Sequence, residues 1–159
     1  MNRAREWIHC NEAYRRGLTG KGVGVAILDT GVFLHPDLEN CVYGFRDFLK
    51  KKQQPYDDNG HGTHVAGLAA ADSELDKGVS GIAPLCKIVP IQVFDGENTS
   101  TTAWVNGIMY AIHNGADVIN TSITTVFKSD IPHDVQEELI RNKFKIKENM
   151  WKWILNTAK

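Results

Sequence analysis

The chain is organised around the stretch Asp58-Asn59-Gly60-His61-Gly62-Thr63-His64-Val65-Ala66-Gly67. It places a histidine at the start of an expected helix, between two glycines that let the backbone pass close to a ligand. The small residues that follow, as far as Ala70, predict a helix that packs tightly against a sheet. A histidine at the open end of such a helix suits the work of a general base. An incidental histidine at a helix start is the alternative, and this stretch alone does not decide between them.

A second stretch supports the functional interpretation. Val23-Gly24-Val25-Ala26-Ile27-Leu28 is a continuous apolar run, typical of a strand that is buried on both faces. The run ends in Asp29-Thr30-Gly31, and open α/β sheets place their sites at the carboxyl ends of such strands. A turn-forming aspartate before glycine is the alternative interpretation. The two stretches together are hard to explain as incidental.

Three short stretches of the sequence match the motifs of one known enzyme family. These two stretches, together with His35-Pro36-Asp37-Leu38, resemble the subtilisin family of serine peptidases. In that family the Asp of D-T-G and the first His of H-G-T-H belong to a Ser-His-Asp triad. The resemblance therefore implies that Asp29 is the orienting carboxylate and His61 the general base. His64, three residues further on the same helix face, is the competitor for the base role.

The pattern along the rest of the chain predicts an α/β fold. It is a doubly wound, mostly parallel sheet with helices on both faces, subtilisin-like and incomplete. We expect residues 1–159 to be the N-terminal part of a subtilisin-like peptidase domain, with the resemblance covering 5–123 and residues 124–159 divergent. The further elements expected are a helix over 3–16, a loop over 35–38, a strand over 41–48, a strand over 86–94 interrupted by Pro90, a helix over 102–114 followed by the capping Gly115, and a strand over 116–122.

The motif of the family's nucleophile, G-T-S-x-A, does not occur in the 159 residues. Ser100, within N-T-S-T-T-A, is a superficial match that lacks the preceding glycine, and the family's A-A-G-N oxyanion segment is also absent. The chain thus holds half a triad. The leading hypothesis is a serine endopeptidase represented by its truncated N-terminal part. The alternative is a catalytically inactive, truncated or degenerate subtilase that binds a peptide or a partner chain.

The resemblance also implies where substrate and metal would bind. An extended peptide would add as a strand beside 96–100 and 122–124, so the substrate-binding candidates are Gly96, Asn98, Ser100, Ser122 and Thr124. Thr124 stands where the family usually has glycine, so its side chain would narrow the cleft. Chemistry requires no cofactor, but Asp37 matches a position that binds structural calcium in many members. Calcium needs six to eight oxygen ligands, and one matched carboxylate does not provide them.

A metal hydrolase is a third hypothesis. His61 and His64, three residues apart, could meet a zinc ion with the upstream carboxylate of Asp58. This hypothesis leaves the D-T-G strand end and the surrounding glycines unexplained.

Composition bounds the partners and the compartment. A formal net charge of −1 gives no electrostatic footprint for nucleic acid or an anionic membrane. The three cysteines form no C-x-x-C motif, so we expect free, buried thiols, which weakly favour a reducing compartment. No apolar leader or membrane-spanning run is visible. We expect a cytoplasmic protein if the chain starts at its natural N-terminus and a secreted one if a leader was removed. The expected partners are a peptide or protein substrate and a complementary C-terminal part of the peptidase.

Overall fold

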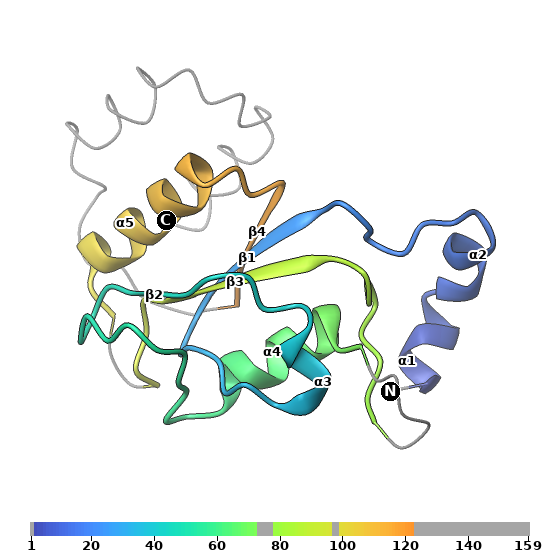
Figure 1. The fold of residues 1–159 in the computed structure, drawn as a ribbon, viewed down its shortest axis with the longest axis horizontal. Coiled ribbons are helices and arrows are strands. Elements are labelled where there is room, and N and C mark those ends of the chain that lie inside the picture. The colour runs from blue at the N-terminus through green and yellow to red at the C-terminus, as the bar shows by residue number, and fades with distance from the viewer. Residues whose placement is uncertain (1, 73–77, 97–98, 123–159) are drawn as a thin grey trace. The chain divides into compact units, whose positions relative to one another are not determined.

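The computed structural model of the chain describes residues 2–72, 78–96 and 99–122. The chain divides into two units, Met1–Ile123 and Thr124–Lys159, and all described residues belong to the first. The helices and strands, shown in Figure 1, are α1 (Asn2–Trp7), α2 (Cys10–Arg15), β1 (Gly24–Asp29), α3 (Pro36–Glu39), β2 (Arg46–Asp47), α4 (His61–Ala70), β3 (Lys87–Gln92), α5 (Thr101–His113) and β4 (Val118–Thr121). None of the described helices is long and apolar enough to cross a membrane.

The four strands form a parallel sheet in the order β2-β3-β1-β4. The chain first builds β2 and β3 on one side of β1 and then crosses to the other side for β4. The carboxyl end of β1, which is Asp29, therefore lies where the strand order reverses, the usual place for a site in an open α/β sheet. The parallel α/β arrangement expected from the sequence is confirmed.

Helices cover both faces of the sheet. On one face, Ala66 and Ala70 of α4 pack with Ile27 of β1. On the other face, Ala111 of α5 packs with Leu28 of the same strand. Figure 1 shows α3 and α4 on the opposite side of the sheet from α5. Successive residues of β1 point to opposite faces, so the continuous apolar run supplies both cores.

The strand expected over 41–48 is shorter in the structure. Val42 forms an isolated bridge with Ile88, and β2 contains only Arg46 and Asp47. Between them Gly44 has a φ of 81°, a left-handed backbone that does not continue a strand. The apolar pattern of this segment is strand-like, but the glycine divides it.

The expectation that Pro90 interrupts the third strand was wrong, because β3 runs through it. Along β3 the N–H groups alternate between neighbours. That of Lys87 donates to Val23 on the β1 side, at 2.9 Å, and that of Ile88 donates to Cys41 on the β2 side, at 2.8 Å. Pro90 has the parity of Ile88, so its missing N–H faces the side where the neighbouring strand is broken. A proline is tolerated there because no ladder bond is lost.

Two helical expectations also need correction. The single helix expected over 3–16 is divided into α1 and α2, with His9 in a left-handed conformation (φ 56°) at the break. No glycine or proline in the sequence marks the break, and after it the Tyr14 hydroxyl donates to the carbonyl of Ile82 at 2.8 Å. The loop expected over 35–38 instead contains the one-turn helix α3, which begins because Pro36 occupies its first turn and the His35 ring accepts the Asp37 N–H at 3.2 Å.

Candidate active site

Asp29 and His61 lie in contact, as the two matched motifs led us to expect. The His61 Nδ1 atom is 2.7 Å from the Asp29 Oδ1 atom. The Asp29 side chain is fully buried, whereas the His61 side chain is 46% exposed. The same Oδ1 atom accepts the N–H of Thr30 at 2.7 Å, and Oδ2 has no hydrogen-bond partner among the described residues. A carboxylate at Nδ1 selects the imidazole tautomer whose Nε2 is free to accept a proton.

Gly62 lets the start of α4 approach the end of β1 closely. A Cβ atom at this position would collide with the carbonyl oxygen of Gly31 and would lie 3.1 Å from the Asp29 Cβ. The Gly62 N–H also donates to the Thr30 hydroxyl at 2.9 Å. Any side chain at position 62 would therefore push His61 away from Asp29.

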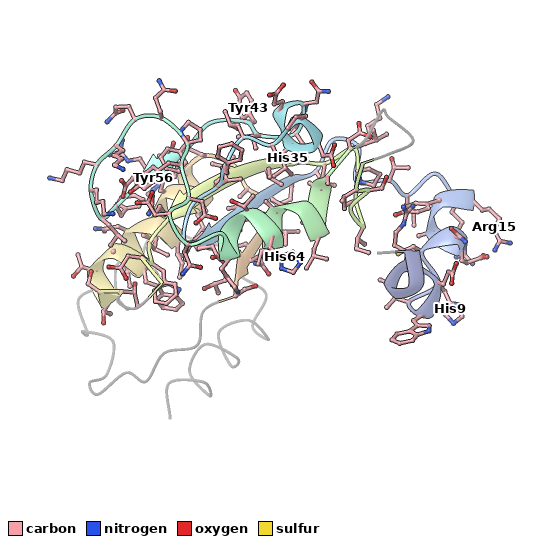
Figure 2. All side chains as sticks on the ribbon, turned by 90° about the horizontal axis from the view of Figure 1, so that it is seen from below. His9, Arg15, His35, Tyr43, Tyr56 and His64 are labelled. Carbon is pink, nitrogen blue, oxygen red and sulfur yellow. The ribbon has the colours of Figure 1, made fainter. Side chains whose placement is uncertain are left out.

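His64 is placed differently from His61. It is exposed on α4 (Figure 2). No described hydrogen bond joins it to Asp29, whose Oδ1 atom contacts His61. The third member of the zinc hypothesis, Asp58, is exposed and pairs with the Lys50 ammonium at 3.3 Å. Within residues 2–72, 78–96 and 99–122, no group of three or more His, Cys, Asp or Glu side chains could hold a metal ion. The geometry therefore favours His61 as the base and gives no support to the zinc hypothesis.

Asp57 is a residue of the site that the sequence interpretation missed. Its carboxylate accepts hydrogen bonds from Thr30, Gly60 and Thr63. Burial by itself raises the pKa of this carboxyl, but the hydrogen bonds outweigh burial and the net pKa is lowered. Asp57 lies three residues before Gly60, the N-cap of α4, so no capping position in the sequence singles it out.

The substrate-edge candidates lie at the carboxyl end of the sheet where the structure describes them. Gly96 follows β3, and the side-chain amide of Asn59 lies so close to it that a Cβ atom at position 96 would collide with that amide. Ser122 follows Thr121, which pairs with Leu28, so Ser122 is level with Asp29 on the neighbouring strand. Asn98 and Thr124 lie outside the described residues.

The serine hydroxyls at this edge already have structural partners. The Ser100 Oγ accepts the N–H of Ala103 at 3.0 Å and caps the start of α5. The Ser122 Oγ accepts from the Asn120 side chain at 2.9 Å. Both serines therefore have roles in local structure, which argues against either as the nucleophile.

Asp37, the calcium candidate, contacts the segment after α4. Its Oδ2 accepts the N–H of Val79 at 2.8 Å. In the described part of the chain, no group of three or more acidic, His or Cys side chains that could hold a metal ion includes it. A single carboxylate falls short of the six to eight oxygen ligands that calcium takes, so Asp37 does not make a calcium site by itself.

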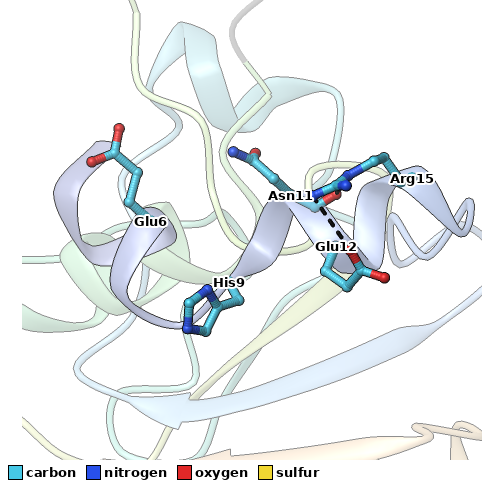
Figure 3. A pocket seen from close by; sticks show the side chains of 5 residues that line it. All are labelled: Glu6, His9, Asn11, Glu12 and Arg15. Carbon is cyan, nitrogen blue, oxygen red and sulfur yellow. Dashed lines mark hydrogen bonds and ion pairs between the residues drawn. The ribbon is translucent and has the colours of Figure 1, made fainter.

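A surface hollow lies between α1 and α2. It is lined by Glu6, His9, Asn11, Glu12 and Arg15 (Figure 3). The Arg15 guanidinium already pairs with Glu12 at 3.3 Å. The lining includes no serine or cysteine, so no side-chain nucleophile of that kind lies there.

The subtilase family model matches residues 20–157, a range that includes both Asp29 and His61. The chain belongs to the subtilase family. The match continues past the stretch 5–123 that carries the quoted motifs. The parallel sheet with helices on both faces is accordingly an α/β, subtilisin-like fold.

Relatives of this subtilase include the serine protease AprX and thermitase. AprX of Bacillus subtilis (strain 168) is 40% identical over 121 residues, 74% of this chain and 27% of that protein. Thermitase of Thermoactinomyces vulgaris is 45% identical over 106 residues, 65% of this chain and 38% of that protein. The solved structure of MycP1 with its N-terminal propeptide removed has a TM-score of 0.69 at 25% identity, covering 87% of this chain and 43% of that chain. The chain thus spans less than half the length of these relatives.

Proposed function

We propose that the chain supplies the Asp-His half of the catalytic triad of a subtilisin-like serine endopeptidase. The observation that carries the proposal is the 2.7 Å contact between Asp29 Oδ1 and His61 Nδ1, with the carboxylate buried and the imidazole open to solvent. Family membership supports the same reaction class, the hydrolysis of peptide bonds. The nucleophile and the oxyanion donor come from a complementary C-terminal part of the peptidase.

In this proposal each residue has one task. Asp29 accepts the Nδ1–H of His61, which fixes the ring orientation and stabilises the imidazolium that forms later. The Nε2 atom removes the serine proton as the hydroxyl attacks the substrate carbonyl. It then returns that proton to the leaving amine. Because Asp29 is fully buried, water does not compete for its contact with His61.

The substrate is an extended peptide held at the carboxyl edge of the sheet. Gly96, Ser100 and Ser122 lie at that edge, and Asn98 and Thr124 belong to the same two segments. The peptide would bind by its main chain, as a strand added beside these segments. Calcium at Asp37 is a separate part of the proposal, and it would serve stability.

A second candidate function is a peptide-binding module without catalysis. The sequence favours it because no G-T-S-x-A serine occurs in the 159 residues, and the cap made by Ser100 agrees with it. The coding sequence beyond Lys159 separates the two candidates. A downstream G-T-S-x-A motif supports the peptidase, and its absence supports the binding module.

A fluorophosphonate reagent tests the assignment on the chain itself. Such a reagent labels a serine only when a base activates it and an oxyanion hole receives the charge. We expect the intact mass of the 159-residue chain to stay unchanged after incubation. A stoichiometric adduct that disappears in His61→Ala would reveal a complete site and would make Ser100 the first residue to mutate. An active subtilase that contains the G-T-S-x-A serine is the positive control.

A further inference from the structure

The carboxylate of Asp57 receives five hydrogen bonds. Its Oδ1 atom accepts the N–H groups of Asn59 at 3.1 Å and Gly60 at 2.8 Å, and the Thr30 hydroxyl at 2.9 Å. Its Oδ2 atom accepts the N–H of Thr63 at 2.9 Å and the Thr63 hydroxyl at 2.6 Å. Both oxygens are thus fully used by neighbours.

These donors come from the two segments that carry the candidate catalytic pair. Thr30 is the residue after Asp29, at the end of β1. Gly60 and Thr63 flank His61, at the start of α4. Thr30 closes a second link, because its hydroxyl oxygen also accepts the Gly62 N–H at 2.9 Å. The Asp57 carboxylate and the Thr30 hydroxyl therefore join the strand end to the helix start on both sides of the Asp29–His61 contact.

From this geometry we propose that Asp57 is a positioning residue that holds His61 Nδ1 at hydrogen-bond distance from Asp29 Oδ1. The inference rests on the proposed function of that pair, which it deepens. Asp57 touches neither reacting ring atom and acts through the backbone of α4. A negative charge next to the first N–H groups of α4 also suits the positive end of the helix.

An amide cannot replace this carboxylate. In Asp57→Asn one oxygen becomes an NH2 group, which donates and does not accept. At the Oδ1 position it would face two backbone N–H groups, and at the Oδ2 position it would face the Thr63 N–H. Either orientation leaves at least one donor without an acceptor, so the start of α4 loosens.

Asp47 offers a matched control. Its carboxylate also accepts several bonds, from the N–H groups of Leu49, Lys50 and Lys52 and from the Tyr56 hydroxyl. Those donors belong to the loop after β2 and make no bond with His61. Asp47→Asn therefore removes a carboxylate that accepts a similar set of hydrogen bonds, without cutting the link between β1 and α4.

The experiment follows the Nδ1–H proton of His61 by NMR in the ¹⁵N-labelled 159-residue chain. Its rate of exchange with water reports whether the contact with Asp29 is kept. We expect Asp57→Asn to speed this exchange about tenfold or more, the effect of leaving a buried hydrogen bond unmade. Thr30→Val removes the hydroxyl that donates to Asp57 and accepts the Gly62 N–H, so it cuts both links and should shift the rate in the same direction. Asp47→Asn should leave the rate at the wild-type value.

The variants separate the possible failures. If Asp29→Asn leaves the exchange rate unchanged, the catalytic pair itself is absent and the proposed function fails. If Asp29→Asn speeds exchange while Asp57→Asn and Thr30→Val match the wild type, the pair stands and the role of Asp57 is overturned. Equal effects of Asp47→Asn and Asp57→Asn would also overturn it, because they would show general loosening. Should Asp57→Asn fail to fold, Thr63→Val decides, because it removes the hydroxyl bond to Asp57 Oδ2 and keeps the link between Thr30 and Gly62. A wild-type exchange rate in Thr63→Val would then overturn the role of Asp57.

Discussion

At the scale of single residues, the site depends on carboxylates with different surroundings. Asp29 is buried and directs one oxygen to His61. Asp57 and Asp47 instead collect backbone N–H groups from the loops around them. For both, burial alone raises the pKa, but the hydrogen bonds outweigh it, so the pKa of each carboxyl is lowered below the ordinary 3.8.

This lowering predicts how stability depends on pH. A carboxyl whose pKa is lower in the folded state stabilises the fold above its unfolded value, and that contribution is lost as the pH falls through the folded value. The contribution of Asp57 should therefore be complete above about pH 4 and disappear below it. Urea titrations at pH 5 and pH 3 should show a smaller drop in midpoint for Asp57→Asn than for the wild type. Parallel drops in the two proteins would contradict this linkage.

The sequence predicted Asp29 and His61 because a family motif marks each of them. It did not predict Asp57, although the residue precedes the same helix, because no motif names it and its partners include Thr30, far away in the chain. The contact between Asn59 and Gly96 was missed for the same reason. Local patterns identify residues with chemistry. Residues that join two segments become visible only when the segments are placed.

At the scale of elements, α4 has two glycines with opposite surroundings. A Cβ at Gly62 would collide with the Gly31 carbonyl, whereas a Cβ at Gly67 would meet nothing within 4 Å. Gly62→Ala should lower the free energy of unfolding by about 1–3 kcal/mol, as overpacking does. Gly67→Ala, in the helix interior, should be neutral or raise it by up to about 1 kcal/mol. Urea denaturation measures both, and equal effects would mean that α4 does not approach β1 as closely as described.

The start of α5 gives a second test at this scale. The Ser100 hydroxyl oxygen caps the helix through the Ala103 N–H. Ser100→Ala should therefore cost about 1 kcal/mol of stability, and Ser100→Asp should restore most of it because aspartate also caps well. Thermal unfolding distinguishes the variants. If Ser100→Ala has no effect on stability, the hydroxyl is free for another role, and the nucleophile question reopens.

The elements differ in how far sequence predicts them. The sequence predicted β1 from its continuous apolar run, α4 from the small residues after His61, and α5 from its apolar face and the capping Gly115. It failed at α1 and α2, where the backbone of His9 turns without a glycine or proline. It failed at Pro90 because a strand continues through a proline only when the missing N–H faces a side without a backbone partner, and the sequence does not show which side that is. Such features are set by tertiary contacts that no single segment contains.

At the scale of the whole molecule, the described residues belong to a subtilase that spans less than half the length of its named relatives. In the described part of the sheet β4 is the last strand in the order, and its Val118 is 48% exposed. If the chain is the N-terminal part of a longer peptidase domain, we expect little side-chain cover at the sheet edge and at Trp151, Trp153 and Leu155. Trp151, Trp153 and Leu155 lie outside the described part of the chain, so for these residues the expectation stays a prediction.

The three cysteines provide a probe of the described unit as a whole. Cys10, Cys41 and Cys86 are all free and buried. Burial, with the Cys86 thiol nearby, raises the pKa of Cys41 to about 11, and burial also raises the pKa of Cys86. A raised pKa removes the thiolate that reacts with disulfide reagents, so burial protects these two cysteines sterically and chemically.

We therefore expect the folded chain to react slowly with the reagent DTNB at pH 8, and all three thiols to react at once in denaturant. Because Cys41 and Cys86 belong to the core between α4 and the sheet, their exposure requires that core to open. Their rate should then follow urea concentration in parallel with global unfolding. Gly62→Ala should speed the reaction, since it weakens the contact between α4 and β1, while Gly67→Ala should not. Rapid reaction of Cys41 or Cys86 in the native chain would show that this core is already open in solution, and the Asp29–His61 contact at its edge would lose its support.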